Sequence, residues 1–208
     1  NRPPTLRSEG GHERSQVGMV ELFFDLVFVF AITQLSHGLL EQLTPQGVLH
    51  TGILFIGAWW LWIYTTWCTN WLNPASTSVR QLLFVLMLLA LVMAAALPRA
   101  FADRGLVFAL AYVAQHLLRS AYMVHAFGAG SAHGRNFIRI FAWLAVSGTC
   151  WVLGGLADPQ ARAFWWTAAI AIEFIGPFAY YRVPGMGASM TTDWDVDPHH
   201  VAERCGLF

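Results

Sequence analysis

Apolar residues form six long segments along the chain, and turns rich in Pro, Gly, Asn and Asp separate them. The segments cover residues 17–40, 48–72, 81–97, 105–127, 137–156 and 163–181. They approach or exceed the roughly 20 apolar residues that a helix needs to cross a hydrocarbon core of about 30 Å. The pattern predicts an all-α, polytopic transmembrane bundle of about six spans over residues 17–183. A polar N-terminus (1–16) precedes it, and a polar connector (184–208) leads into a further helix.

The composition supports the same class. Of the 208 residues, 56% are apolar and 12% are charged, and the mean hydropathy is +0.50, unlike an ordinary soluble domain. The formal net charge is zero, so no overall field attracts nucleic acid. The lipid bilayer is therefore the expected partner. The three cysteines (Cys68, Cys150 and Cys205) are too scattered for a disulfide framework, and the sequence assigns no cofactor.

The arginines predict an orientation in the bilayer. If the six segments alternate across the membrane, eight arginines lie on the side of the N-terminus: Arg2, Arg7, Arg14, Arg80, Arg135, Arg139, Arg182 and Arg204. Only three lie on the other side: Arg99, Arg104 and Arg162. By the positive-inside rule, the N-terminus and the connector lie in the cytoplasm. The expected location is the bacterial inner membrane, in a multi-pass arrangement.

Two carboxylates lie inside the first apolar segment. Glu21 and Asp25 are four residues apart, so on a helix they share one face. A charge at the bilayer centre costs about 2.5 to 3.5 kcal/mol on insertion scales. The pair therefore requires a partner cation, a metal ion, water or bound protons. Interhelical pairing that only stabilises the bundle is the alternative.

The fourth segment supplies a counter-charge. Five of its polar side chains fall within an arc of about 120° on one helical face: Tyr112, Gln115, His116, Arg119 and Tyr122. An ion pair from Arg119 to Asp25 or Glu21 would neutralise one carboxylate. His116, one turn away, could then respond to the remaining proton. A static polar network is the alternative.

Glu173 lies near the middle of the sixth segment. With Arg119 assigned to the first segment, Glu173 needs a hydrogen-bond donor or must carry a proton at neutral pH. It is therefore a candidate proton carrier. A protonated glutamate with a structural role is the alternative.

The connector contains a candidate metal site at His199, His200 and Glu203. His199 and Glu203 are four residues apart on a beginning helix, where a histidine and a carboxylate can bind one metal ion. The order differs from the His-Glu-x-x-His pattern of zinc proteases. The acidic residues of the connector can equally be solvated or cap the next helix.

Three motifs resemble one known family. They are Val-Glu-Leu-Phe-Phe-Asp-Leu-Val-Phe-Val-Phe-Ala-Ile at residues 20–32, Trp-Trp-x-Trp at 59–62 with Asn70, and His-His-Val-Ala-Glu-Arg-x-Gly-Leu-Phe at 199–208. Through them the chain resembles the bacterial low temperature requirement protein A family over essentially its whole length. The resemblance implies a membrane location, correspondence to about the first half of a member, and further spans after residue 208. The positions that match the family are Glu21, Asp25, His200, Glu203 and Arg204.

Three functions fit these residues. The first is a proton- or cation-coupled carrier of a small ion or molecule, in which Glu21, Asp25 and Glu173 bind protons or cations while His116 and Arg119 control their charge. Gln115 belongs to the same expected site. The second is a membrane-embedded enzyme that acts on a lipid or prenyl substrate, with a metal ion at the connector site. The third is a non-catalytic membrane scaffold, and a homo-oligomer is compatible with all three.

Overall fold

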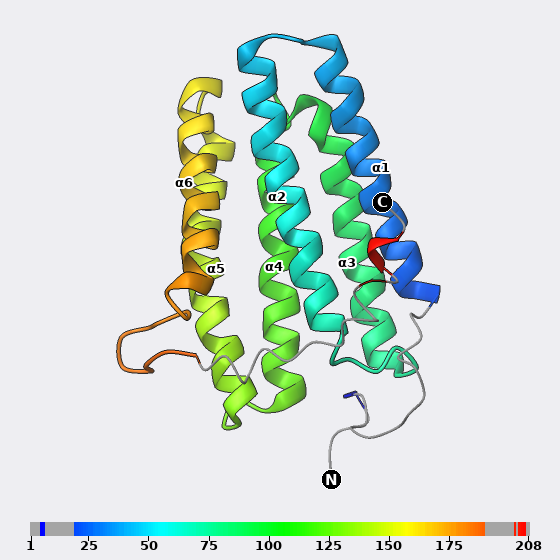
Figure 1. Cartoon of the computed structure of the whole chain (residues 1–208), viewed down its shortest axis with the longest axis vertical. Helices are drawn as coiled ribbons and strands as arrows, with labels where there is room; N and C mark the ends of the chain where they lie inside the picture. Colours follow the sequence, from blue (N-terminus) through cyan, green and yellow to red (C-terminus); the bar gives the residue numbers. More distant parts are fainter. Residues whose placement is uncertain (1–4, 7–18, 190–201, 203, 207–208) are drawn as a thin grey trace.

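Six long helices run the height of the molecule in alternating directions, and short turns join them (Figure 1). The structure is a computed structural model that describes residues 5–6, 19–189, 202 and 204–206. The helices are α1 (Met19–Glu41), α2 (Pro45–Thr69), α3 (Thr77–Ala96), α4 (Gly105–Phe127), α5 (Ala132–Leu156) and α6 (Pro159–Phe178), with a short 3₁₀ helix η1 (Leu97–Arg99) after α3. None of the residues described forms a β-strand. The predicted all-α class is confirmed.

Local capping fixes where three of the helices begin. The side-chain oxygen of Thr44 accepts a hydrogen bond from the backbone N–H of Gly47 before α2, and that of Ser131 accepts one from Gly134 before α5. The carboxylate of Asp158 accepts two backbone N–H groups at the start of α6. These bonds satisfy donors that have no partner inside a helix. The turns therefore end one helix and start the next within a few residues.

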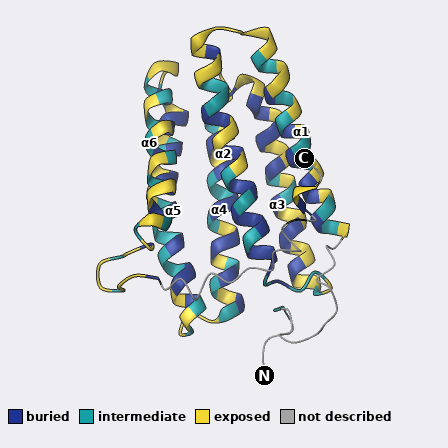
Figure 2. Ribbon diagram, in the orientation of Figure 1, coloured by how far each residue is buried: buried dark blue, intermediate teal, exposed yellow. Residues whose placement is uncertain are grey.

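The outward faces of the helices are apolar. Figure 2 shows the exposed residues on the outside of the bundle, and large apolar side chains such as Phe84, Leu88, Phe164 and Phe178 are exposed there. Four helices are long and apolar enough to cross a membrane: α1, α2, α5 and α3 extended by η1. The prediction of a transmembrane helical bundle is confirmed, with four candidate spans by this measure rather than about six.

The two other long helices, α4 and α6, are less apolar because they carry buried polar side chains. These are Gln115, His116, Arg119 and Ser120 in α4, and Arg162 and Glu173 in α6. Such residues lower the mean hydropathy of a helix although they lie inside the bundle. The site described below is therefore built largely from these two helices and their neighbours.

Helix α2 packs between α1 and α6 and also touches α4, and α3 joins α1 to α4. Helices α4, α5 and α6 pack in that order, and α1 packs against α3. Helix α2 contacts α1, α4 and α6, so its different faces meet different neighbours. Side chains of α2 can therefore bind polar groups of both α1 and α4.

Glycines allow close approach between α4 and α5. A Cβ atom at Gly155 would lie 2.9 Å from the Cα of Leu106 and 3.1 Å from the carbonyl oxygen of Gly105. At Gly52, in α2, a Cβ atom would have no neighbour within 4 Å. Small residues at such crossings are typical of membrane helix packing.

These contacts give a prediction about stability. Gly155→Ala should lower the free energy of unfolding by about 1–3 kcal/mol, because the backbone of α4 must move away. The matched control Gly52→Ala should be neutral or stabilising by up to about 1 kcal/mol. Unfolding of both variants by SDS titration in mixed micelles measures the difference. Equal effects at the two glycines would contradict the close contact between α4 and α5.

Candidate functional site

Two groups of buried polar side chains lie on different faces of α2. The first, the Asp25 cluster, consists of Asp25, Trp62, Thr69 and Arg204. The second, the Glu173 cluster, consists of Tyr112, Ser147, Trp151 and Glu173, and His116 and Arg119 lie beside it. All of these side chains are buried. They come from α1, α2, α4, α5, α6 and the segment around residue 204.

A bidentate ion pair forms the centre of the Asp25 cluster. The guanidinium of Arg204 donates to Asp25 Oδ1 at 2.5 Å and to Oδ2 at 2.8 Å. The indole N–H of Trp62 also donates to Oδ1, at 2.8 Å. The third arm of the guanidinium donates to the hydroxyl of Thr69 at 2.5 Å. Both charged side chains are 0% exposed, so each neutralises the charge of the other inside the bundle.

The predicted ion pair from Arg119 to Asp25 or Glu21 is wrong. Arg119 donates instead to the hydroxyl of Thr65 at 2.9 Å and to the carbonyl of Leu61 at 3.4 Å, both on α2. Asp25 lies on another side of α2 and receives its counter-charge from Arg204. The pairing depends on which face of α2 each charge meets, and the order of the segments does not reveal this.

Glu21 and Asp25 are both buried, at 1% and 0% exposure, in agreement with their expected position on one helical face. The other predicted connector residues, His199, His200 and Glu203, lie outside the described residues. Among the residues that are described, no group of three or more His, Cys, Asp or Glu side chains could hold a metal ion.

Three neutral donors hold the carboxylate of Glu173. The hydroxyl of Ser147 donates to Oε1 at 2.6 Å, and the indole N–H of Trp151 donates to the same oxygen at 2.9 Å. The hydroxyl of Tyr112 donates to Oε2 at 2.7 Å. Glu173 is 3% exposed, and the described side chains give it no ion-pair partner within 4 Å. Glu173 was expected to need a hydrogen-bond donor, and three side chains donate to its carboxylate.

His116 and Arg119 form a second polar unit beside this carboxylate. One guanidinium nitrogen of Arg119 lies 2.7 Å from His116 Nδ1. Because a guanidinium only donates, Nδ1 must accept, and the proton of the neutral imidazole is then on Nε2. His116 Nε2 and Arg119 Nε are buried, and neither has a hydrogen-bond partner in the described part of the chain. The ring of His116 lies 4.6 Å from that of Tyr112, which binds Glu173.

Gln115 shares the buried face of α4 with His116 but takes no part in either cluster. Its side-chain N–H group donates to the carbonyl of Ala111 at 3.1 Å and approaches the sulfur of Met93 at 3.8 Å. Its Oε1 atom is buried and lacks a partner in the part of the chain described. Gln115 therefore offers one acceptor inside the bundle.

Sequence reasoning missed the roles of four residues. Trp62 appears there only as part of the Trp-Trp-x-Trp motif, and the sequence pattern assigns no hydrogen-bond partner to Ser147, Trp151 or Thr69. A serine on the inward face of α5 is a usable signal, because its hydroxyl must find a partner when buried. The inward direction of an indole N–H depends on the rotamer and cannot be read from spacing.

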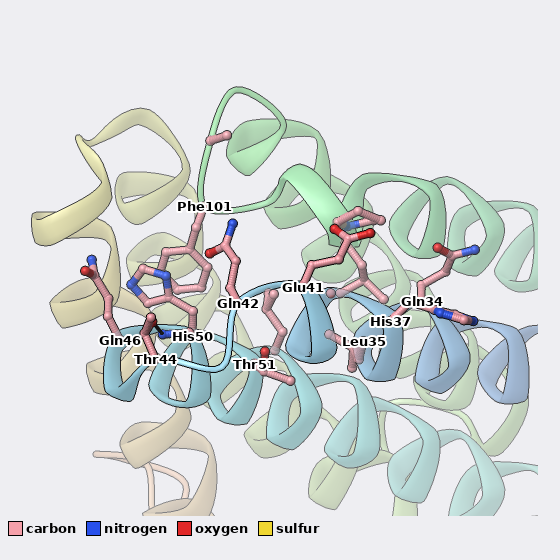
Figure 3. Close-up of a pocket in the computed structure, with 16 residues that line it drawn as sticks. Gln34, Leu35, His37, Glu41, Gln42, Thr44, Gln46, His50, Thr51 and Phe101 are labelled. Carbon is pink, nitrogen blue, oxygen red and sulfur yellow. Dashed lines mark hydrogen bonds between the residues drawn. The ribbon is translucent and has the colours of Figure 1, made fainter.

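A polar pocket of about 390 Å³ opens where α1, α2 and η1 meet, at the end of the bundle where α1 ends and α2 begins (Figure 3). Helix α1 contributes Gln34, His37 and Glu41 from successive turns, and α2 contributes Gln46, His50 and Thr51. The ring of His50 stacks on Phe101 at 3.6 Å. Buried Leu35, Leu54 and Leu97 also line the pocket. It is a polar recess at one end of an otherwise apolar bundle.

The match to a known family covers almost the whole chain. The model of the bacterial low temperature requirement A protein (LtrA) matches residues 16–208. The chain belongs to the LtrA family. This LtrA-family chain is also 44% identical over 210 residues to a protein of Rhizobium meliloti (strain 1021) described as uncharacterized protein RA0937. The match covers 100% of this chain and 51% of that relative, so the chain spans about half of its length. No solved structure is a significant match to it.

Of the three buried carboxylates of this LtrA-family member, Asp25 and Glu173 differ in their electrostatic surroundings. The charge of Asp25 is balanced by Arg204 at bidentate distance. The carboxylate of Glu173 is held by neutral hydroxyl and indole groups, and the charge of Arg119 acts on it from further away. Neutral donors can stabilise either an anion or, after one hydroxyl turns, a carboxylic acid. Glu173 is thus the carboxylate better suited to gain and lose a proton.

Proposed function

We propose that this integral membrane protein is part of a proton-coupled carrier, and that Glu173 is the group that binds the proton. The observation that supports this most directly is the cradle of Tyr112, Ser147 and Trp151 around a buried carboxylate. Ionisable residues inside a membrane bundle are costly and usually serve a function. Asp25 is assigned a structural role in this proposal, because its charge is already paired.

The hydroxyl of Ser147 allows the cradle to accept a protonated carboxyl group. It lies 2.6 Å from Glu173 Oε1 and 3.5 Å from the backbone carbonyl of Leu144. With the carboxylate ionised, the hydroxyl donates to Oε1. With a proton on Oε1, it can turn to donate to Leu144 and accept from Glu173. Both protonation states then keep their hydrogen bonds without movement of a helix.

His116 and Arg119 control the charge of the carrier in this proposal. The guanidinium of Arg119 attracts the ionised carboxylate and keeps His116 in the Nε2-protonated form. The Nε2–H group is buried and has no acceptor among the described residues. It can therefore donate a hydrogen bond to the transported ion or molecule, or to water. The transported partner is a small ion or molecule that enters with or against the proton.

The proposed orientation, with the N-terminus in the cytoplasm, is supported by the arginines at the two ends of the bundle. The ends of helices at the N-terminal side carry Arg80, Arg135 and Arg182, and those at the other side carry Arg99 and Arg104. With the N-terminus in the cytoplasm of a bacterial inner membrane, the polar pocket in Figure 3 faces outward. It is then the aqueous entrance on that side.

Proton flux in proteoliposomes tests the proposal. The protein is reconstituted with a pH-sensitive dye inside, and a potassium diffusion potential drives protons inward. Glu173→Gln should lower the protein-dependent flux by about 100-fold, the scale of a positioned proton-transfer group. Ser147→Ala should lower it by less, because Tyr112 and Trp151 remain. The exposed Asp103→Asn, which only breaks a surface pair with Arg99, should leave the flux unchanged.

A second measurement separates proton binding from a scaffold role. Infrared difference spectra between acidic and alkaline pH should contain a carboxylic acid C=O band that disappears in Glu173→Gln. A scaffold predicts that Glu173→Gln changes only the melting temperature and leaves flux and spectrum as in the wild type. Wild-type flux in a folded Glu173→Gln variant would exclude Glu173 as the proton carrier.

A further inference from the structure

The polar pocket between α1, α2 and η1 presents a negative charge to whatever enters it. Glu41 is the only Asp, Glu, Lys or Arg among the described residues that line it, so with neutral histidines at pH 7 the lining carries one formal negative charge. The carboxylate is exposed and has no hydrogen-bond or ion-pair partner in the described part of the chain. Figure 3 shows it between the side chains of Gln34 and Gln42.

The arginines at this end of the bundle lie outside the pocket lining. Arg99 donates to Asp103 at 2.6 Å. Arg162 donates to four backbone carbonyl oxygens at 2.8 to 3.0 Å. Arg104 is exposed at the turn before α4. A carboxylate or phosphate inside the pocket would therefore meet the charge of Glu41 without a cationic side chain to balance it.

The helix ends at the pocket also favour positive charge. Helix α1 ends at Glu41 and has no basic side chain in its last turn, so its terminal carbonyl groups keep a partial negative charge. Helix α2 begins at the same pocket, but most of its first N–H groups are used. Pro45 has none, and those of Gly47 and Val48 donate to Thr44. The pocket therefore offers more to a cation than to an anion.

The lining favours an organic cation over a metal ion. Among the residues described, no group of three or more His, Cys, Asp or Glu side chains could hold a metal. Three glutamines line the pocket instead: Gln34, Gln42 and Gln46. Their amide oxygens accept hydrogen bonds, and an ammonium group carries up to three N–H donors. The volume of about 390 Å³ lies within the range of small-molecule pockets, about 300–1,000 Å³.

We propose that this pocket binds a small organic cation with an ammonium group, and that such cations are the molecules that the carrier transports. The ammonium group lies against the carboxylate of Glu41 and donates to the amide oxygens of Gln34 and Gln42. The rest of the molecule extends towards the stacked rings of His50 and Phe101. Transport of the cation rests on the proposed function, whereas binding in the pocket does not, because Glu173 is not part of the lining.

Isothermal titration calorimetry of the protein in nanodiscs tests the site with three probes of one chain length. These are 4-amino-1-butanol, which is a cation at pH 7, the neutral 1,4-butanediol and the anionic 4-hydroxybutyrate. The cation should bind saturably. The diol should bind about tenfold more weakly, the scale of one charge-assisted hydrogen bond, and 4-hydroxybutyrate should bind more weakly still.

One variant and a matched control place the cation in the pocket. Glu41→Gln should weaken binding of 4-amino-1-butanol about tenfold, because the amide keeps the shape of the side chain and loses its charge. Glu41 is exposed, so the variant should fold. Asp158→Asn removes a carboxylate at the same end of the bundle, outside the lining, and keeps an N-cap residue for α6. It should bind the cation as the wild type does.

Three results would overturn the proposal. They are equal binding of the cation and the diol, wild-type affinity in Glu41→Gln, and no saturable binding of 4-amino-1-butanol to the wild-type protein. The last of these needs no variant to fold. Glu173→Gln should bind the cation with wild-type affinity. Binding without proton flux would therefore remove the carrier and keep the site, whereas flux without binding would remove only the site.

Discussion

Asp25→Asn is expected to lower the free energy of unfolding by about 3–5 kcal/mol, the cost of leaving one member of a buried ion pair uncompensated. The asparagine keeps the volume of the side chain and can still accept from Trp62. It cannot balance the positive charge of Arg204, whose guanidinium is 0% exposed. SDS titration in mixed micelles, followed by helical circular dichroism, measures the loss.

A double variant separates the ion pair from its two charges. Asp25→Leu combined with Arg204→Met removes both charges and keeps an apolar filling, and buried pairs replaced in this way often lose little stability. The double variant should therefore be much more stable than Asp25→Asn. Asp103→Asn, which breaks the exposed pair with Arg99 at 2.6 Å, is the control and should cost less than about 1 kcal/mol. If Asp25→Asn lowers the free energy of unfolding as little as this control does, the ion pair between Asp25 and Arg204 does not stabilise the fold.

This pair also shows what the sequence can and cannot reveal. The shared face of Glu21 and Asp25 follows from their spacing of four residues, because a helix has 3.6 residues per turn. The partner of Asp25 lies 179 residues further along the chain. No periodicity relates positions so far apart, and only the folded structure shows that Arg204 lies against α1. Arg204 belongs to a family motif, but the motif alone does not name its partner.

The Glu173 cluster was predictable in part. Glu173 and Tyr112 could be chosen because a carboxylate and an inward-facing tyrosine are rare on apolar helices. Their contact could not be predicted, because it depends on α4, α5 and α6 packing in that order. The apolar pattern predicts helices well, since it depends on local spacing. Mean hydropathy alone is a poorer guide, because the buried polar residues of α4 and α6 lower it and leave both helices out of the candidate spans.

Arg162 illustrates a different role for a buried charge. Its guanidinium donates to the backbone carbonyl oxygens of Gly154, Ala157, Ala100 and Ala102, at 2.8 to 3.0 Å. The first two belong to the end of α5, and the other two to the loop after η1. Carbonyls at a helix C-terminus lack partners within the helix and carry partial negative charge. One side chain thus donates hydrogen bonds to the carbonyl groups of two turns at the same end of the bundle.

Arg162→Met is therefore expected to lower the free energy of unfolding by about 3–4 kcal/mol, because several buried carbonyl groups lose a charged donor together. Arg162→Lys should recover only part of this, since a compact ammonium cannot reach both turns as a planar guanidinium does. Arg104→Met, at an exposed position of the same end, is the control and should change stability by less than about 0.5 kcal/mol. Hydrogen exchange should quicken first in residues 97–104 and around residue 157, where the carbonyls are released. If Arg162→Met unfolds at the wild-type SDS concentration, the arginine is only a surface charge at this turn, and the two loops must be joined by other contacts.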